Sequence, residues 1–207
     1  DITLLDLSYN APQVKPVLAE KQGDVLHLNI GERAAKRKYM DVKDGGEEFI
    51  LSGSDGNVTV TFGEWSHTYA GISKVIGNAG EGKDVIDASA LSEVAVEFTG
   101  GGGRDKLISG SGAATLSGGD GRDTLDARIA LAGSTLLGGG GDDRLYGSSF
   151  DDVMRGGDGD DKLLAFGGDD LLEGEGGDDS LAGGSGNDVY EFTDGFGVDR
   201  FGDNEGE

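Results

Sequence analysis

Residues 156–164 read GGDGDDKLL, and their three aspartates are the side chains best suited to chemistry. Asp158, Asp160 and Asp161 place three carboxylates within four residues, and carboxylate oxygens are preferred ligands of hard divalent cations. Carboxylates this close repel one another in a compact state, and the flanking glycines lose more backbone entropy on folding than any other residue. The stretch therefore needs a component from outside the sequence to hold it folded.

The same pattern recurs every nine residues. Six windows follow one another without a gap over 138–191, three more cover 100–126, and single windows start at 79 and at 194. The shared pattern is G-G-x-G-x-D-x-U-x, where U is a large apolar residue. Position six is Asp in ten of the eleven windows, with Ala114 as the exception, and position eight is apolar in all eleven. A fixed period indicates a solenoid rather than the disorder that acidic, glycine-rich composition otherwise favours.

Each repeat divides into a turn and a short strand. The x-U-x triplet is expected to form a three-residue strand with its middle side chain pointing inward. The six residues before it are expected to form a turn in which glycine supplies positive φ angles. Strands and turns then wind into a flat coil of two sheets, and neighbouring repeats must stack because each strand offers only one core side chain. The predicted inward column contains Ile86, Leu107, Leu116, Leu125, Leu145, Met154, Leu163, Leu172, Leu181, Tyr190 and Phe201.

This arrangement resembles the RTX nonapeptide proteins, whose repeats form a parallel β-roll that binds Ca²⁺ inside its turns. The resemblance covers residues 79–202. It implies an all-β fold with a calcium-binding roll and an aromatic cap over 79–207. An irregular β-rich region, residues 1–78, is expected to stack on the roll.

The resemblance also implies where calcium binds. Each ion lies between two turns on the same edge of the roll, one coil apart. Its ligands are the position-six Asp of both turns, the carbonyls of positions one and three of one turn, and those of positions two and four of the other. The implied metal-binding residues are Asp84, Gly100, Gly101, Gly102, Gly103, Asp105, Gly118, Gly119, Asp120, Gly121, Asp123, Gly138, Gly139, Gly140, Gly141, Asp143, Asp152, Gly156, Gly157, Asp158, Gly159, Asp161, Asp170, Gly174, Gly176, Gly177, Asp179, Gly183, Asp188 and Asp199.

Successive turns lie on alternate edges, and the two edges differ. If the irregular segments 88–99 and 127–137 each replace one repeat, the first edge carries the turns that start at 79, 100, 118, 138, 156, 174 and 194. All of these keep the position-six Asp. The second edge carries both irregular segments, the turn with Ala114, and the turns at 147, 165 and 183. We expect five or six ions on the first edge and at most two on the second.

Calcium is expected to act as a folding switch. Two carboxylates 4–5 Å apart repel by roughly 3–4 kcal/mol at an effective dielectric near 20. We therefore predict that residues 76–207 are largely unfolded in chelator and β-rich in millimolar Ca²⁺. The resemblance implies that such chains cross the bacterial envelope unfolded and fold outside it, which predicts a secreted or cell-surface location.

The charge of the chain supports a cation as its partner. The net charge is −23, with 11 acids and 8 bases in residues 1–75 and 29 acids and 9 bases in residues 76–207. This acidity argues against nucleic acid or an anionic membrane as a partner. There is no Cys, and no apolar run approaches the ~18–20 residues of a membrane span. The chain begins at Asp1 without Met, and we interpret it as part of a larger parent chain.

The N-terminal region lacks the nine-residue period. Residues 24–30 alternate in polarity and predict a strand, 47–62 predict a hairpin with an Asp-Gly turn at 55–56, and 65–76 and 92–98 predict further strands. The region most simply forms irregular coils that cover the N-terminal end of the roll. A separate small β-domain is the alternative.

The aromatic residues near the C-terminus are expected to cap the last coil of the roll. They are Tyr190, Phe192, Phe196 and Phe201. A carbohydrate-stacking patch is the alternative interpretation of this cluster.

The sequence contains no recognisable catalytic set. Its two histidines, His27 and His67, lie in strand-like runs, and no nucleophile elbow, zinc-protease or phosphate-loop motif occurs. We therefore predict a non-enzymatic structural or adhesion module of a large bacterial surface protein. The alternatives are the calcium-dependent tail of a secreted enzyme (a protease, a lipase or a polysaccharide epimerase) or of a toxin, and a module that binds a glycan.

Overall fold

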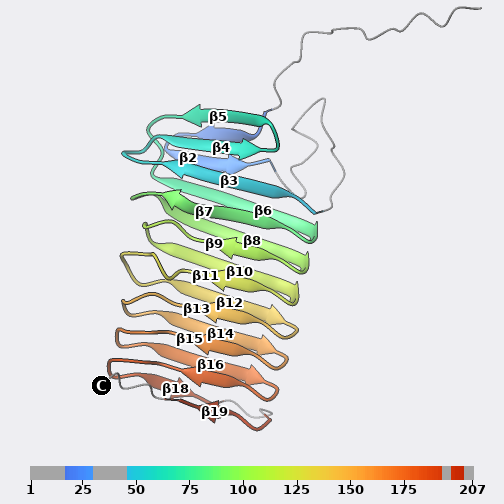
Figure 1. Ribbon diagram of the computed structural model, residues 1–207, viewed down its shortest axis with the longest axis vertical. Helices are drawn as coiled ribbons and strands as arrows, with labels where there is room; N and C mark the ends of the chain where they lie inside the picture. Colours follow the sequence, from blue (N-terminus) through green and yellow to red (C-terminus); the bar gives the residue numbers. More distant parts are fainter. Residues whose placement is uncertain (1–16, 30–45, 193–196, 203–207) are drawn as a thin grey trace, which may run out of the picture.

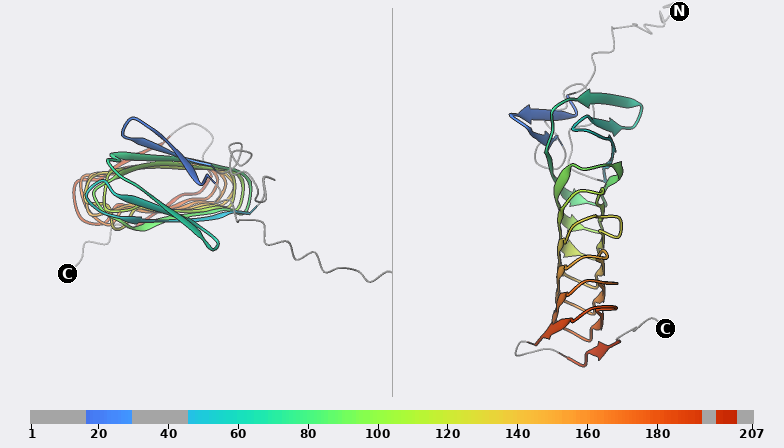
Figure 2. Two further views of the ribbon diagram at one scale, coloured as in Figure 1. Left: turned by 90° about the horizontal axis from the view of Figure 1, so that it is seen from above. Right: turned by 90° about the vertical axis from the view of Figure 1, so that its left-hand side faces the viewer.

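The computed structural model describes residues 17–29, 46–192 and 197–202, which form a flat, all-β solenoid (Figure 1). Two sheets face each other, and the chain passes between them at two edges, so the roll is a flattened oval when seen along its axis (Figure 2). This part of the chain has no helix of the length and hydropathy that a membrane crossing requires.

Sheet A has nine strands and sheet B has ten. In spatial order, sheet A consists of β1 (Ala19–Gln22), β2 (Val25–Leu28), β6 (Lys74–Gly82), β8 (Ala95–Gly103), β10 (Ala114–Gly121), β12 (Thr135–Gly140), β14 (Val153–Asp158), β16 (Leu171–Gly176) and β18 (Val189–Glu191). Sheet B consists of β19 (Arg200–Phe201), β17 (Ser180–Ala182), β15 (Lys162–Leu164), β13 (Arg144–Tyr146), β11 (Thr124–Asp126), β9 (Lys106–Ile108), β7 (Val85–Leu91), β3 (Glu48–Gly53), β4 (Val58–Phe62) and β5 (Trp65–Tyr69).

The strand register confirms that each irregular segment replaces one repeat. Leu116 of β10 pairs with Phe98 of β8 on one side and with Leu136 of β12 on the other. All three side chains therefore occupy the same column, although irregular sequence separates them. The turns stay on the edges to which the period assigns them.

The strands of the two sheets differ in length, which the nine-residue pattern did not predict. In sheet B, β9, β11, β13, β15 and β17 have three residues each, as expected for x-U-x. In sheet A, β6 to β16 have six to nine residues. They are longer because the glycines that begin each first-edge turn still pair between coils, as Gly119 does with Gly101 and Gly139.

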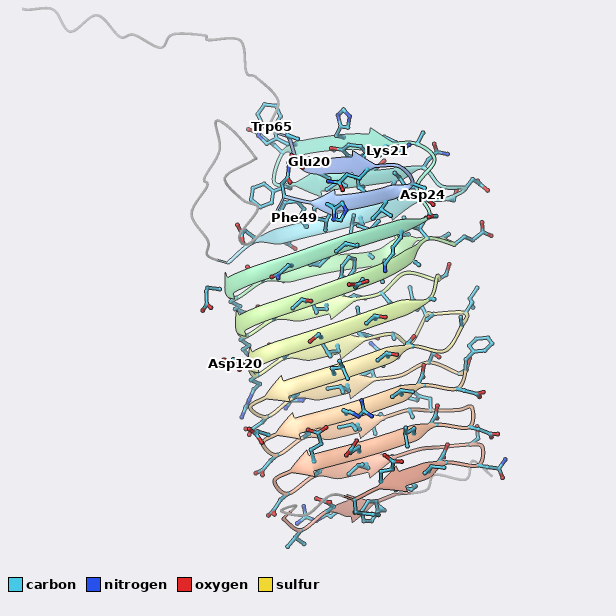
Figure 3. All side chains as sticks on the ribbon, turned by 180° about the vertical axis from the view of Figure 1, so that it is seen from behind. Glu20, Lys21, Asp24, Phe49, Trp65 and Asp120 are labelled. Carbon is cyan, nitrogen blue, oxygen red and sulfur yellow. The ribbon has the colours of Figure 1, made fainter. Side chains whose placement is uncertain are left out.

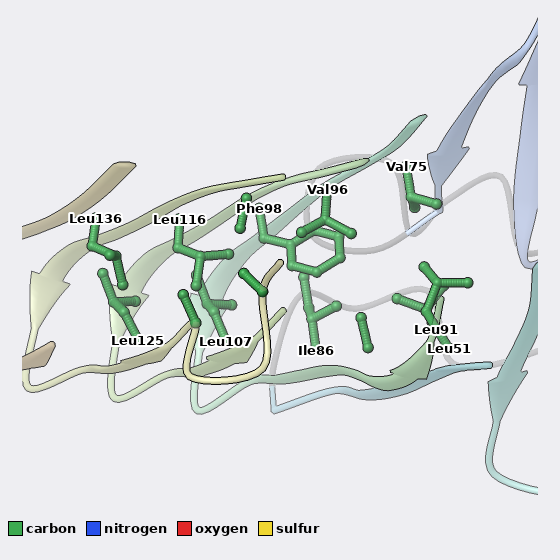
Figure 4. Close-up of a cluster of buried hydrophobic side chains, with 14 of the residues drawn as sticks. Leu51, Val75, Ile86, Leu91, Val96, Phe98, Leu107, Leu116, Leu125 and Leu136 are labelled. Carbon is green, nitrogen blue, oxygen red and sulfur yellow. The ribbon is translucent and has the colours of Figure 1, made fainter. Parts of the chain in front are cut away.

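The core is a double column of inward side chains between the sheets. Figure 4 shows Phe98, Leu116 and Leu136 of sheet A facing Leu107 and Leu125 of sheet B. The first nine members of the predicted inward column are at most 2% exposed, which confirms that prediction for them. The last two differ because the roll ends there. Tyr190 is partly buried, and Phe201 is 48% exposed.

The N-terminal end of the roll is built from antiparallel hairpins that continue the two sheets. β1 and β2 form a hairpin, and β2 pairs in parallel with β6. β3, β4 and β5 form an antiparallel meander, and β3 pairs in parallel with β7. The labelled side chains of Glu20, Lys21, Asp24, Phe49 and Trp65 all lie at this end (Figure 3). The predicted hairpin at 47–62 is confirmed, with Asp55 and Gly56 at φ 52° and 71°, and the predicted strand at 24–30 is confirmed over Val25–Leu28. Ile30 lies outside the described residues.

Two strand predictions are wrong in their extent. Residues 65–76 are not one strand, because the chain turns after Tyr69, with Gly71 at φ 66°, and crosses from sheet B to sheet A. Residues 92–98 are only partly extended, because Glu93 adopts φ 63° in a turn and β8 begins at Ala95. Neither region has the glycine spacing that marks the turns of the regular repeats.

Aromatic rings meet at the C-terminal end. The Phe201 ring makes edge contacts with Tyr190 and Phe192, with centroid distances of 5.3 and 5.1 Å. The Tyr190 hydroxyl accepts a hydrogen bond from the N–H of Gly183 at 2.9 Å. Phe196, the fourth member of the predicted cap, lies outside the described residues.

Candidate metal centre

The position-six aspartates of the first edge form a ladder along the roll axis. In each step, the backbone N–H of one Asp donates a hydrogen bond to Oδ1 of the Asp one coil further along. The distance is 2.7 Å both from Asp105 to Asp123 and from Asp123 to Asp143. The other steps are Asp84 to Asp105 (2.8 Å), Asp143 to Asp161 (2.7 Å), Asp161 to Asp179 (2.8 Å) and Asp179 to Asp199 (3.1 Å).

The second carboxylate oxygen of the ladder residues is buried without a partner. Within the described part of the chain, no hydrogen-bond donor reaches Oδ2 of Asp105, Asp123, Asp143, Asp161 or Asp179. A buried polar atom without a partner is costly, and a charged one more so. Such atoms are rare in native proteins unless a bound ion or water satisfies them. The repeated Oδ2 atoms therefore indicate where a cation belongs.

Oxygens of adjacent turns face the same space beside each position-one glycine. A Cβ placed on Gly118 would lie 2.5 Å from Asp123 Oδ2 and 2.5 Å from the carbonyl oxygen of Gly138. Gly100 faces Asp105 Oδ2 and the Gly118 carbonyl in the same way, both at 2.5 Å. The arrangement repeats at Gly138 and Gly156. Carboxylate and carbonyl oxygens from two coils are the donor set that Ca²⁺ takes.

Carbonyl oxygens must supply most of the ligands in such a site. Across residues 17–29, 46–192 and 197–202, no three acidic or histidine side chains gather closely enough to hold a metal by themselves. The position-three acids Asp120 and Asp158 have exposed side chains, and Asp120 lies at the edge of the roll (Figure 3). The resemblance predicts that they contribute through their backbone carbonyls. The remaining predicted glycines occupy turn positions one to four.

Burial raises the pKa values of the ladder carboxylates. Burial, with a smaller addition from neighbouring carboxylates, raises the pKa of Asp105 and Asp143 to about 6 and that of Asp161 to about 7. Burial also raises the pKa of Asp123 and Asp179. A cation between the turns would reverse this tendency, because an opposite charge nearby favours the ionised form.

The equivalent column of the second edge changes character along the roll. Val75, Val96 and Ala114 occupy it in turn, paired in register and buried. Ser134 follows, and its N–H donates to Asp152 Oδ1 at 2.6 Å. The ladder then continues with Asp152 to Asp170 at 2.7 Å and Asp170 to Asp188 at 3.0 Å. Apolar side chains therefore occupy this column in the N-terminal half of the second edge, and aspartates occupy it only in the C-terminal half.

Asp152 differs from the other ladder residues because a serine N–H donates a hydrogen bond to its second carboxylate oxygen. The N–H of Ser148 donates to Asp152 Oδ2 at 2.5 Å, so both carboxylate oxygens have protein partners. Asp170 Oδ2 is buried without such a partner, and burial raises the Asp170 pKa to about 7. On the second edge, the space between the turns of Asp170 and Asp188 is the better candidate site.

Glu47, which the nine-residue pattern did not predict, is the first member of the first-edge ladder. Its N–H donates to Asp84 Oδ1 at 2.6 Å, and Glu47 is only 7% exposed. Glu48 and Phe49 pair with Val85 and Ile86, which gives Glu47 the position-six place in the preceding coil. The available signal was an acid two residues before an apolar residue, without the usual glycine spacing.

The calcium-free roll is expected to become more stable as the pH falls from about 7 towards 4. The folded-state pKa values lie above the ordinary 3.8, so over this range the folded state binds protons that the unfolded chain releases. The resulting stabilisation is complete below the unfolded-state pKa and is lost as the pH rises through the folded-state values. Circular dichroism in metal-free buffer at pH 5 and pH 7.5 measures this effect. A β signal that grows with pH contradicts the expectation.

Comparison with known families agrees with this geometry. A family model described as the RTX calcium-binding nonapeptide repeat (4 copies) matches residues 98–128, 137–165 and 164–198. Neither a curated protein nor a solved structure matches the chain significantly. The matched segments hold the ladder from Asp105 to Asp188 and the parallel coils around it. The matched residues, 98–128 and 137–198, thus contain RTX calcium-binding nonapeptide repeats that fold as a parallel β-roll.

Proposed function

We propose that this chain is a non-enzymatic module whose roll folds when calcium binds between its turns. It does so outside the cell, as a structural or adhesive part of a larger bacterial surface protein. The observation that carries the proposal is the row of buried Oδ2 atoms without protein partners. The family's link to secretion and the excess of acids in residues 76–207 support the extracellular setting.

The chain's own residues explain why calcium would control folding. Each first-edge carboxylate from Asp105 to Asp179 uses Oδ1 to join its coil to the preceding one and leaves Oδ2 for a cation. The bound ion supplies positive charge between carboxylates that otherwise repel one another. Because the same aspartates serve both contacts, ion binding and coil stacking are coupled.

The two histidines are not part of the proposed calcium sites. His27 lies on β2 and His67 on β5, at the N-terminal end of the roll. The His67 ring packs on Tyr69 with a centroid distance of 4.6 Å. The nearby hydroxyl of Tyr69 is engaged with the backbone of Ala19, at 3.2 Å from its N–H and 3.0 Å from its carbonyl oxygen.

Calorimetric titration of the calcium-free chain with Ca²⁺ tests the proposal. We expect five or six ions on the first edge and one or two on the second, with binding heats that coincide with the gain of β structure. Magnesium should not replace calcium, because it requires a tighter octahedral site and loses its water reluctantly. A chain that binds no calcium, or binds it without a change in fold, refutes the folding role.

Substitution of adjacent aspartates separates ladder positions from ordinary surface charge. Asp161→Asn removes the buried oxygen beside Gly156 and is expected to raise the calcium concentration at the folding midpoint by about tenfold or more. Asp160→Asn removes the same charge from the same turn but from an exposed side chain, and it should shift the midpoint by less than about twofold. Equal shifts for the two variants would mean that bulk charge, not a defined site, controls folding.

A further inference from the structure

The outer face of sheet B carries a straight row of exposed cations. Lys106, Arg144, Lys162 and Arg200 all occupy position seven of their repeats. The register places them in one column, with Thr124 and Ser180 at the two intervening places. Since neighbouring strands lie about 4.8 Å apart, the row spans about 24 Å along the roll axis.

These four cations are unpaired, unlike those of the opposite face. Across the described residues, no carboxylate lies within ion-pair distance of any member of the row. On sheet A, Lys74 and Arg155 pair with Glu97 and Glu173. The only acid in the strands β9 to β19 of sheet B is Asp126, which pairs with Arg128. The strands β9 to β19 of sheet B therefore carry a net positive charge in a chain of net charge −23.

A partly apolar column lies beside the row of cations. Ile108, Tyr146, Leu164 and Ala182 hold position nine in these strands and are partly exposed, and Asp126 holds the place between Ile108 and Tyr146. Amphipathic side chains such as Tyr pack well against ligands that are apolar on one side and wet on the other. Sugar rings have this character, with C–H faces and hydroxyl edges.

Two cavities are lined by residues of this column, and a third cavity shares lining residues with both of them. One of about 380 Å³ is lined by Lys106, Ile108 and Arg128, among others. The third, of about 180 Å³, shares Arg128 with the first and Phe166 with the second, which measures about 250 Å³. Apolar walls with a few convergent polar groups are typical of ligand sites.

We propose that this face binds a linear polysaccharide that carries carboxylate groups, with the sugar chain lying along the roll axis. The collinear cations would hold the carboxylates, and the position-nine column would pack against the sugar rings. A narrow ligand is required because both edges of the face are acidic. Exposed Asp160 and Asp178 and the partly buried Asp142 line the first edge, and exposed Asp151 and Asp169 line the second. These acids repel a broad polyanion such as duplex nucleic acid or an anionic bilayer.

The binding face depends on the proposed function, because calcium must hold the coils in register before the cations can align. Binding of a galacturonate hexamer is therefore measured by calorimetry on the full chain in constant millimolar Ca²⁺, after circular dichroism has shown each variant to be folded. The double variant Arg144→Gln/Lys162→Gln is expected to bind about tenfold or more weakly. The matched control Lys74→Gln/Arg155→Gln removes two charges from sheet A and should change affinity less than about twofold.

The outcomes separate this inference from the folding role. A folded wild-type chain that binds no galacturonate, or equal losses in the two double variants, overturns the polysaccharide site while the calcium proposal stands. Binding of a neutral glucose hexamer or of polyglutamate as tightly as galacturonate overturns the assignment to acidic sugars. If Arg144→Gln/Lys162→Gln does not fold, the site is tested instead by measuring which lysines of the wild-type chain are acetylated with and without galacturonate. Bound galacturonate should protect Lys106 and Lys162 but leave Lys74 reactive, and equal reactivity of the three refutes the site.

Discussion

Removing calcium is expected to unfold the roll from the first repeat to the C-terminal cap. An ion that binds only the folded state contributes about 2.7 kcal/mol at a hundredfold excess over Kd, so five sites contribute about 13 kcal/mol. This sum is comparable to the free energy of unfolding of an ordinary domain. The orphaned Oδ2 atoms of the ladder add a desolvation cost that nothing else in the described chain offsets. Circular dichroism before and after chelation measures the loss, and an unchanged spectrum contradicts it.

Unfolding by chelator should be graded along the roll. In the N-terminal half of the second edge, the position-six column contains the apolar residues Val75, Val96 and Ala114. In the C-terminal half it contains Asp152 and Asp170. Hydrogen exchange at intermediate chelator concentrations should therefore show β12 to β17 losing protection before β6 and β8 do. Simultaneous loss over all coils would show instead that the first-edge column alone decides stability.

The substitution Gly121→Ala is expected to prevent the coils around it from stacking. Gly121 holds position four at φ +138°, a backbone conformation essentially reserved for glycine. A Cβ there would lie 1.5 Å from the carbonyl oxygen of Gly103 in the preceding coil. Both clashing groups belong to the backbone, so relief requires the coils to separate. We expect the free energy of unfolding in saturating calcium to fall by more than about 4 kcal/mol, measured by denaturant titration.

Gly140→Ala provides the matched control for this clash. Gly140 holds position three of the next first-edge turn, outside the positive-φ range, and the nearest atom to its added Cβ is Asp120 Oδ1 at 3.7 Å. Alanine fits there and restricts the unfolded chain, so stability should stay equal or rise by up to about 1 kcal/mol. Equal losses for the two variants would show that the roll tolerates no side chain in its turns, whatever the position.

The regular part of the fold could be predicted from the sequence because its constraints repeat. One apolar residue every nine places predicted the inward column, and the sixth-position Asp predicted which carboxylates the turns bring together. Leu116 and Leu136 lie in one column even across an irregular segment. The nine-residue period alone is enough to predict this column, because each coil contacts only its neighbours.

The departures from the period could not be predicted in this way. Glu47 and Ser134 occupy ladder places without the surrounding motif, and only strand pairing reveals them. The serine N–H that satisfies Asp152 depends on the local path of one turn. The break between β5 and β6 at Gly71 follows from which sheet each strand joins. These features are set by tertiary contacts, which local sequence patterns do not record.

The aspartate ladder has a mechanical consequence. Its hydrogen bonds run along the long axis, and each joins one coil only to the next, 18 to 21 residues further along the chain. Tension on the two ends of the rod therefore loads these junctions in series, and the weakest one opens first. Each opening lets the chain lengthen by about 60 Å, which is the extended length of an 18-residue coil. A rod of this design yields by short, repeated extensions rather than by one rupture.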